Sequence, residues 1–141
     1  MVEKNRPKKK IIWIVQVLDN KGTEYQLESG KTKIGRYPDL NKIVIDAQFK
    51  RVSREHCCIT IKEDIAMKVG EPSIPECLYE DVGSANGSYK ILSGKRPLEL
   101  RKGCPYPIED GNIIRLGHYE SIEGTVDIRF VTRKFLETLV E

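Results

Sequence analysis

The stretch KIIWIVQVLDNKGTEYQLE, residues 10–28, decides the fold class of this 141-residue chain. Its first half, KIIWIVQVL, is rich in β-branched side chains, which favour extended strands. The sequence DNKG, residues 19–22, is typical of a tight turn, and TEYQLE then predicts a returning strand. The stretch therefore predicts a β-hairpin, and it makes an all-β chain the first expectation.

The same alternation of short strands and turn residues continues to the C-terminal region. After the turn in ESGK, we expect strands in TKIG, NKIVID, HCCITIK, IAMKV, CLYEDV, GSYKIL, NIIRLG and TVDIRFV. Strands of this length and spacing predict an antiparallel β-sandwich of about ten or eleven strands. The exception is a short amphipathic helix expected over residues 133–141 and packed on the domain, because apolar residues recur there at helical spacing: Phe135, Leu136, Leu139 and Val140.

Length and charge restrict the class of protein further. A chain of this size favours one domain, which we expect over residues 11–132. Residues 1–10 carry five basic groups and one acidic group, whereas the rest of the chain carries 19 basic and 20 acidic groups. The basic character therefore belongs to a flexible tail, which fits a nuclear import signal, a weak nucleic-acid contact or a solvated arm. The near-neutral remainder predicts no other nucleic-acid surface.

Hydrophobic runs and cysteines indicate the compartment. The apolar run IIWIV, residues 11–15, is too short to cross a membrane, and the N-terminus has no secretory hydrophobic region. The four cysteines contain no C-x-x-C spacing, and the adjacent pair Cys57 and Cys58 would point to opposite faces of a strand. We therefore expect buried free thiols in a reducing intracellular protein, nuclear or cytoplasmic, with no metal and no cofactor.

Three loop segments carry the polar groups that suggest a binding site: IGRYPDLN (residues 34–41), RVSREH (residues 51–56) and EDVGSANGSY (residues 80–89). Loops at one end of a sandwich commonly form the functional site. If these loops meet, they combine the Arg36 guanidinium, the Ser53 hydroxyl and the backbone N–H groups of a Gly-rich turn. Such a set of donors suits a phosphate dianion.

The segment KRVSREH, residues 50–56, has two other interpretations. KRVS resembles a basophilic kinase site, which makes Ser53 a candidate for phosphorylation, although a folded binding loop would not extend easily into a kinase. Ser53 and His56 also resemble a nucleophile and its base. However, the sequence has no G-x-S-x-G elbow and no acidic residue identifiable as an orienting partner. We favour the phosphate-receptor interpretation and expect no enzyme.

The order of three motifs within this run of strands resembles the forkhead-associated (FHA) domain. The motifs are Gly35-Arg36, the SxxH sequence from Ser53 to His56, and Asn86-Gly87. The sequence IEDGNIIRLG, residues 108–117, is similar to the late turn and strand of that family. The resemblance covers residues 11–132 and implies a β-sandwich whose loops bind a phosphothreonine peptide.

The resemblance also implies roles for single residues. Arg36 and Ser53 would contact the phosphate, and Arg54 would add a second positive charge. Asn86 would hydrogen-bond the peptide backbone. His56 would brace the loops from beneath without touching the ligand, and Gly35 and Gly87 would support the site.

Two positions concern affinity and selectivity. The family turn Gly-Ser-Thr-Asn-Gly is GSANG here, so Ala85 replaces a threonine and forgoes a hydrogen bond worth about 1–3 kcal/mol to a charged partner. A contact from Ser84 or Arg54 to the bound peptide would compensate for this lost hydrogen bond. Arg51 lies two residues before Ser53 and shares its face in an extended segment, so it would contact an acidic residue C-terminal to the phosphothreonine.

The expected function is therefore recruitment of a phosphorylated partner in kinase signalling, with nuclear DNA-damage and cell-cycle signalling as settings common in the family. An alternative is an FHA-fold interaction domain that binds its partner independently of phosphate. Ala85 supports this alternative, and the presence of Arg36 and Ser53 argues against it.

Overall fold

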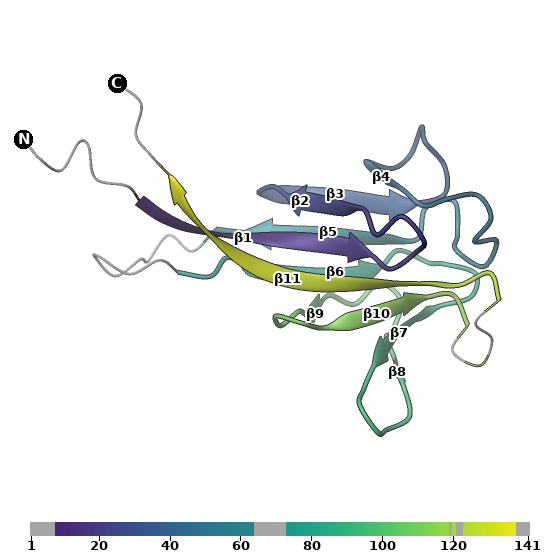
Figure 1. The fold of residues 1–141 in the computed structure, drawn as a ribbon. Helices are drawn as coiled ribbons and strands as arrows, with labels where there is room; N and C mark the ends of the chain where they lie inside the picture. The colour runs from purple at the N-terminus through teal and green to yellow at the C-terminus, as the bar shows by residue number, and fades with distance from the viewer. Residues whose placement is uncertain (1–7, 64–72, 119, 121–122, 138–141) are drawn as a thin grey trace, which may run out of the picture.

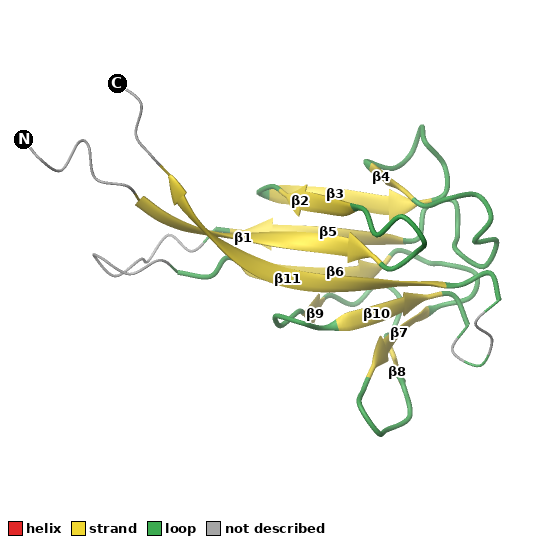
Figure 2. Ribbon diagram, viewed as in Figure 1, coloured by secondary structure: helices red, strands yellow, loops and turns green. Residues whose placement is uncertain are grey.

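The computed structural model describes residues 8–63, 73–118, 120 and 123–137, and every regular element among them is a β-strand (Figures 1 and 2). One sheet has six strands in the order β2 (Glu24–Leu27), β1 (Lys8–Val17), β11 (Val126–Glu137), β10 (Ile113–Leu116), β7 (Ser88–Ile91) and β8 (Leu98–Glu99). The other has five, in the order β4 (Ile43–Val44), β3 (Gly30–Gly35), β5 (Cys57–Lys62), β6 (Glu76–Asp81) and β9 (Tyr106–Pro107). The predicted β-sandwich of about eleven strands is confirmed.

The details of the strands differ from the expectation in two places. The pairing of β3 with β4 is parallel, whereas the other strand pairs are antiparallel. Strands β8 and β9 were not predicted, because a two-residue strand has no periodicity to detect. The expected strand IAMKV, residues 65–69, lies outside the described residues.

The prediction of a C-terminal helix over residues 133–141 is wrong for residues 133–137, which form the end of β11. This part of β11 pairs with the first residues of β1, from Lys8↔Glu137 to Ile12↔Arg133. A helix of fewer than about 12 residues has little stability of its own. The interstrand hydrogen bonds therefore outweigh the helical spacing of a few apolar residues. Residues 138–141 lie outside the described part of the chain.

The N-terminal boundary also lies earlier than expected. Strand β1 begins at Lys8, so three lysines assigned to the tail are part of the sheet, and only residues 1–7 lie outside the described residues at this end. Figure 1 shows β1 and β11 continuing together to one end of the molecule, away from the loops that follow β3 and β6.

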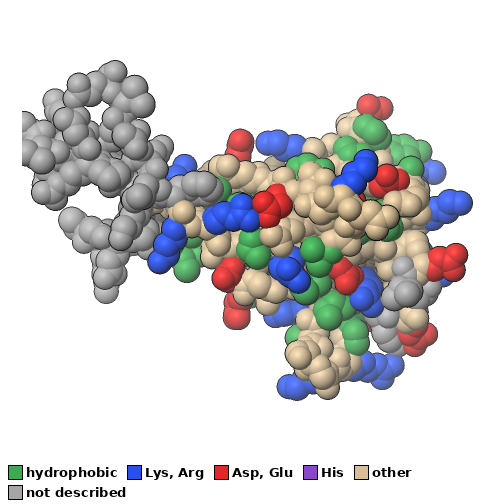
Figure 3. Space-filling view, viewed as in Figure 1, with side chains coloured by type: hydrophobic (Ala, Val, Ile, Leu, Met, Phe, Trp, Pro, Cys, Tyr) green, Lys and Arg blue, Asp and Glu red, His purple; other side chains and the backbone are tan. Residues whose placement is uncertain are grey.

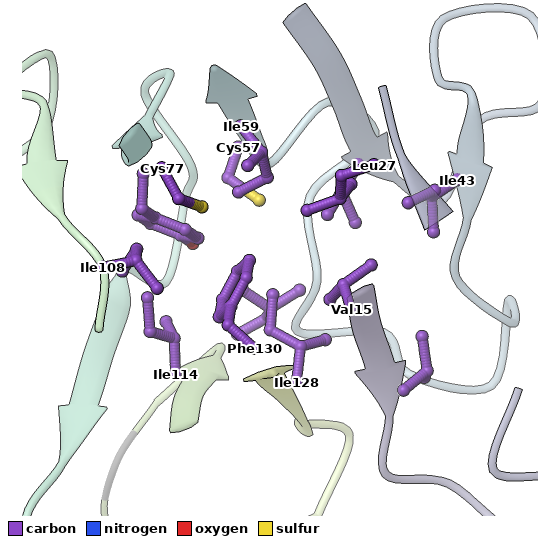
Figure 4. Close-up of a cluster of buried hydrophobic side chains, with 14 of the residues drawn as sticks. Val15, Leu27, Ile43, Cys57, Ile59, Cys77, Ile108, Ile114, Ile128 and Phe130 are labelled. Atoms are coloured by element: carbon purple, nitrogen blue, oxygen red, sulfur yellow. The ribbon is translucent and has the colours of Figure 1, made fainter. Parts of the chain in front are cut away.

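The core lies between the two sheets, and its side chains point toward one another from both (Figure 4). Tyr79 and Phe130 are both fully buried, and their rings meet edge to face with centroids 6.3 Å apart. Cys57 and Cys77 belong to this core, and all four thiols are free. Burial raises the pKa of Cys77 to about 12, which keeps its thiol protonated. Within the described part of the chain, no helix is long and apolar enough to span a membrane.

Strand direction brings the three polar loops together. Strands β3 and β6 run toward the same end of the sandwich, and β5 starts there (Figure 1). The antiparallel pairings of β3 with β5 and of β5 with β6 require this arrangement. The segments after Gly35, before Cys57 and after Asp81 therefore share one end of the molecule.

Candidate functional site

An open hollow of about 350 Å³ lies where the three polar loops meet. It contains six of the ten residues expected to bind or support a ligand. Its lining residues are Arg36, Lys50, Arg51, Val52, Ser53, Arg54, Glu55, Gly83, Ala85 and Asn86.

The six expected residues in this lining are Arg36, Arg51, Ser53, Arg54, Ala85 and Asn86. The other four expected residues, Gly35, His56, Ser84 and Gly87, do not line the hollow. The structure therefore separates the expected residues into a group at the hollow and a group around it.

Backbone hydrogen bonds place Arg36 at the edge of the hollow. Its N–H donates to the Ser53 carbonyl at 3.1 Å, and its Nε donates to the Val52 carbonyl. Gly35 makes this close approach possible. A Cβ at position 35 would press against the Arg54 carbonyl and lie 2.8 Å from the Asn41 side-chain nitrogen. The loop after β3 and the loop before β5 are thus held edge to edge.

Asn41 and Tyr37 contact the same loop and were not expected as site residues. The Asn41 side-chain N–H group donates to the carbonyls of Tyr37 and Arg54. The Arg54 guanidinium carbon lies 5.1 Å from the centre of the Tyr37 ring, which is a cation–π contact. Arg54 therefore has a preferred position at the rim even though its side chain is exposed.

The Ser53 hydroxyl connects the hollow to the turn after β6. Its oxygen accepts a hydrogen bond from the Ala85 N–H at 2.8 Å. The Asn86 side chain adds a second connection by donating to the Arg51 carbonyl at 3.0 Å. Because the Ser53 oxygen accepts in the first bond, the hydroxyl proton can still be donated to a ligand.

His56 lies beneath the hollow and is fully buried. The Ser53 N–H donates to its Nδ1 at 3.0 Å, so the ring proton is on Nε2, which donates to the Gly87 carbonyl at 2.9 Å. Burial lowers the pKa of His56, although the nearby Asp81 carboxylate raises it, so the ring is neutral at pH 7. Both ring nitrogens bond to backbone groups, which gives His56 no contact that would activate the Ser53 hydroxyl.

Asp81 organises the turn and was missed in the sequence. Its carboxylate accepts hydrogen bonds from the backbone N–H groups of Gly83 and Ser84, at 2.9 and 2.7 Å, and from the hydroxyls of Ser84 and Ser88, both at 2.6 Å. Burial raises the pKa of Asp81, but the hydrogen bonds from Ser84 and Ser88 outweigh it and hold the pKa below its usual value. An aspartate two residues before a glycine is a typical turn signal that could have identified it.

Ser84 does not occupy the position expected of a peptide contact. It is 1% exposed, and its hydroxyl donates to Asp81 and accepts from the Gly87 N–H at 3.0 Å. Gly87 has a φ of +94°, and its carbonyl is the acceptor for His56. Only Ala85 and Asn86 of this turn therefore present side chains at the hollow.

Arg51 is fixed against the loop between β10 and β11. Its N–H donates to the Gly124 carbonyl at 2.9 Å, and its Nε donates to the Glu123 carbonyl at 3.0 Å. Lys50, a neighbour that the motifs did not identify, also lines the hollow. The acidic lining residue, Glu55, is paired with Lys33 at 2.9 Å.

The hollow therefore concentrates positive charge, with four basic residues and one acidic residue in its lining. By contrast, the face in Figure 3 shows basic and acidic side chains interspersed over the sheets. Among the described residues, no group of three or more His, Cys, Asp and Glu side chains could hold a metal ion. The chemistry of the hollow is that of an anion receptor.

Comparison with known proteins identifies the family. The sequence model of the FHA domain matches residues 32–117, which is more than half of the chain. The protein therefore belongs to the FHA family, whose domains are protein-interaction modules. No curated protein sequence matches the chain significantly.

Solved FHA structures have the same fold. An FHA domain from a study of phosphothreonine-dependent FHA interactions is 26% identical, with a TM-score of 0.57 over 85% of this chain and 95% of that chain. The FHA domain of the CT664 protein from Chlamydia trachomatis is 25% identical, with a TM-score of 0.58 over 85% and 96%. The FhaA FHA domain, solved in complex with the intracellular domain of Rv3910, is 27% identical, with a TM-score of 0.54 over 86% and 99%.

Proposed function

We propose that this FHA domain binds a phosphothreonine-containing segment of a partner protein and thereby recruits that partner after a kinase has acted. The observation that carries the proposal is the meeting of Arg36, Ser53 and Arg54 in one open, positively charged hollow. Phosphorylation adds about −1.5 to −2 charge and three acceptor oxygens to a threonine. An unmodified hydroxyl offers nothing comparable to arginines that must lose water on binding.

Each residue has a proposed role that follows from its position. Arg36 and Ser53 bind the phosphate, Ser53 through the proton that its bond from Ala85 leaves available. Arg54 adds charge from the rim, where Tyr37 holds it. Asn86 binds the peptide backbone through the groups of its amide that remain after its bond to Arg51.

The support of the hollow is part of the proposal. His56 joins the two loops through the Ser53 N–H and the Gly87 carbonyl. Gly35 permits the close approach of the Arg54 carbonyl. Together these contacts set the position of Ser53 before a ligand arrives, which lowers the ordering cost of binding.

Arg51 and Lys50 support a preference for acidic residues near the phosphothreonine. Arg51 lines the hollow while its Nε is held by the Glu123 carbonyl, so its charge has a defined position. We propose that it contacts an acidic residue C-terminal to the phosphothreonine. Arg51→Ala should remove that preference without removing phosphate dependence.

The cellular setting is proposed from the sequence. The basic segment within residues 1–10 supports a nuclear location, where DNA-damage and cell-cycle kinases provide phosphothreonine partners. The free cysteines support a reducing compartment. Imaging the full chain with and without residues 1–10 tests this proposal, because loss of nuclear accumulation is expected on deletion.

The test of the function is calorimetric titration with a degenerate phosphothreonine peptide pool, alongside matched phosphoserine and unmodified pools. We expect binding to the phosphothreonine pool alone. Arg36→Ala should weaken it by at least about 30-fold, because a charge-assisted contact to the phosphate is lost. Lys62→Ala, which removes an exposed charge at the far end of β5, is the matched control and should bind as the wild type does.

Equal binding to the phosphorylated and unmodified pools, unaffected by Arg36→Ala, would overturn the proposal in favour of phosphate-independent recognition. If no pool binds, Ala85→Thr is titrated next. Restored phosphothreonine binding by that variant would assign the loss to the missing hydroxyl at position 85.

A further inference from the structure

A second basic loop lies at the same end of the sandwich as the hollow proposed to bind phosphate, which is called the phosphate hollow below. Strand β7 pairs antiparallel with both β8 and β10, and β7 begins directly after the turn at Gly87. Strand β8 therefore runs back toward that end of the molecule. Residues 100–104, which follow β8, arrive beside the turn that Asp81 organises.

Two hydrogen bonds attach this loop to the turn. The Gly103 N–H donates to the Asp81 carbonyl at 2.8 Å, and the Leu100 N–H donates to the Ser88 carbonyl at 2.9 Å. Gly83, two residues after Asp81, lines the phosphate hollow. The loop after β8 is thus a direct neighbour of the hollow's wall.

The loop has a hollow of its own, of about 450 Å³, lined by Glu99, Leu100, Arg101 and Lys102. Arg101 and Lys102 are exposed, and Leu100 is buried beneath them. The His56 pKa gives a second sign of proximity. Burial is the main cause of its lowering, but the positive charge of Lys102 also lowers it. Lys102 therefore lies near the residue that connects Ser53 to Gly87.

We propose that Arg101 and Lys102 form a second subsite, which binds an Asp- and Glu-rich segment of the same partner that carries the phosphothreonine. This inference rests on the proposed function, and it adds a class of partner sequence to it. Charge complementarity selects an acidic occupant. Because the loop after β8 lies next to the turn that lines the phosphate hollow, we infer that its occupant is a segment of the bound partner rather than a separate molecule.

The covalent link between the acidic segment and the phosphothreonine explains how an exposed subsite contributes to binding affinity. An isolated ion pair at a protein surface contributes little. Once the phosphothreonine is bound, however, an acidic segment of the same chain is held near the loop at a high effective concentration. We expect the acidic segment to tighten binding about three- to tenfold at low salt, with less gain as salt screens the charges.

The experiment compares three phosphothreonine peptides by titration. The first is short and has neutral flanks, the second adds four acidic residues on one side, and the third adds them on the other side. The domain is tested as wild type, as Arg101→Ser/Lys102→Ser and as Lys62→Ser/Lys95→Ser. The last variant removes the same charge from exposed positions at the end of β5 and in the β7–β8 hairpin, away from the phosphate hollow.

One acidic extension should tighten binding to the wild type and to the Lys62→Ser/Lys95→Ser control. The gain should disappear in Arg101→Ser/Lys102→Ser, while the short peptide binds all three proteins equally. Glu99→Gln should have the opposite effect. It removes the acidic lining residue and should increase the gain in affinity that the acidic extension gives.

Two outcomes of the variant comparison would overturn the inference. One is a gain in affinity that survives in Arg101→Ser/Lys102→Ser. The other is an equal loss of that gain in both double variants, which would assign the gain to general electrostatics. If neither extension tightens binding while the short peptide binds, the inference fails alone. If the short phosphothreonine peptide does not bind, the proposed function fails and the inference with it.

Discussion

At the scale of single residues, the hollow depends on groups that never reach its surface. Asp81 is fully buried, yet it accepts four hydrogen bonds from the turn that presents Ala85 and Asn86. A buried carboxylate is costly unless such bonds satisfy it. The turn and the carboxylate therefore stabilise each other, and the Ala85 N–H reaches Ser53 as a consequence.

Asp81→Ala should lower the free energy of unfolding by about 3 kcal/mol or more, because it leaves buried N–H and hydroxyl groups without an acceptor. Asp81→Asn should cost less, since one side-chain oxygen remains as an acceptor. Denaturant unfolding measures both. A loss below about 0.5 kcal/mol for Asp81→Ala, the range of ordinary surface substitutions, would contradict this account.

At the scale of elements, the end of β11 shows how pairing overrides local pattern. The apolar spacing after Thr132 is compatible with a helix, but β1 offers a partner for every residue from Arg133 to Glu137. Ile11 and Ile12, opposite Lys134 and Arg133, are each 7% exposed. The end of β11 therefore pairs with a part of β1 that buries apolar side chains.

Deleting residues 133–141 should lower the free energy of unfolding by about 2 kcal/mol or more, because Ile11 and Ile12 lose their paired strand. Deleting only residues 138–141 is the control, since it keeps all described pairs of β1 with β11. Thermal and denaturant unfolding compare the two truncations. Equal stability of both would show that the end of β11 contributes nothing.

At the scale of the whole molecule, the sandwich separates two tasks. The sheets bury an apolar core around Tyr79 and Phe130, and the loops at one end carry the cationic hollow. A net charge of +3 for the whole chain does not reveal this concentration. The buried polar groups His56 and Asp81 connect the two regions and make stability depend on pH.

Stability should fall as pH falls, in two windows. The pKa of folded His56 lies below its ordinary value of 6.5. As the pH falls below about 6.5, the unfolded chain therefore binds this proton more readily than the folded protein does, and the free energy of unfolding decreases. The pKa of folded Asp81 lies below 3.8, so its contribution is present above that pH and is lost below it.

Chemical unfolding at a series of pH values measures both windows. His56→Gln should be less stable than the wild type at pH 7, because the Gln side chain does not reproduce both ring hydrogen bonds, but its slope between about pH 6.5 and pH 4.5 should be shallower. His118 is the other histidine and is unchanged in the comparison. Parallel slopes for the two proteins would exclude His56 as the source of the first window.

The sequence by itself determined the all-β class, the three loop motifs and the family resemblance that the FHA match confirms. These features are local: strand propensity, turn residues and the order of short motifs are properties of neighbouring residues. Tertiary structure decided the burial of Ser84, the role of Asp81, the strand at residues 133–137 and the position of Lys102 beside the turn. The strand at residues 133–137 and the position of Lys102 depend on contacts between residues distant in the chain, whose energies exceed local preference. The burial of Ser84 and the role of Asp81 depend on hydrogen bonds within one irregular turn, which has no periodic pattern in the sequence.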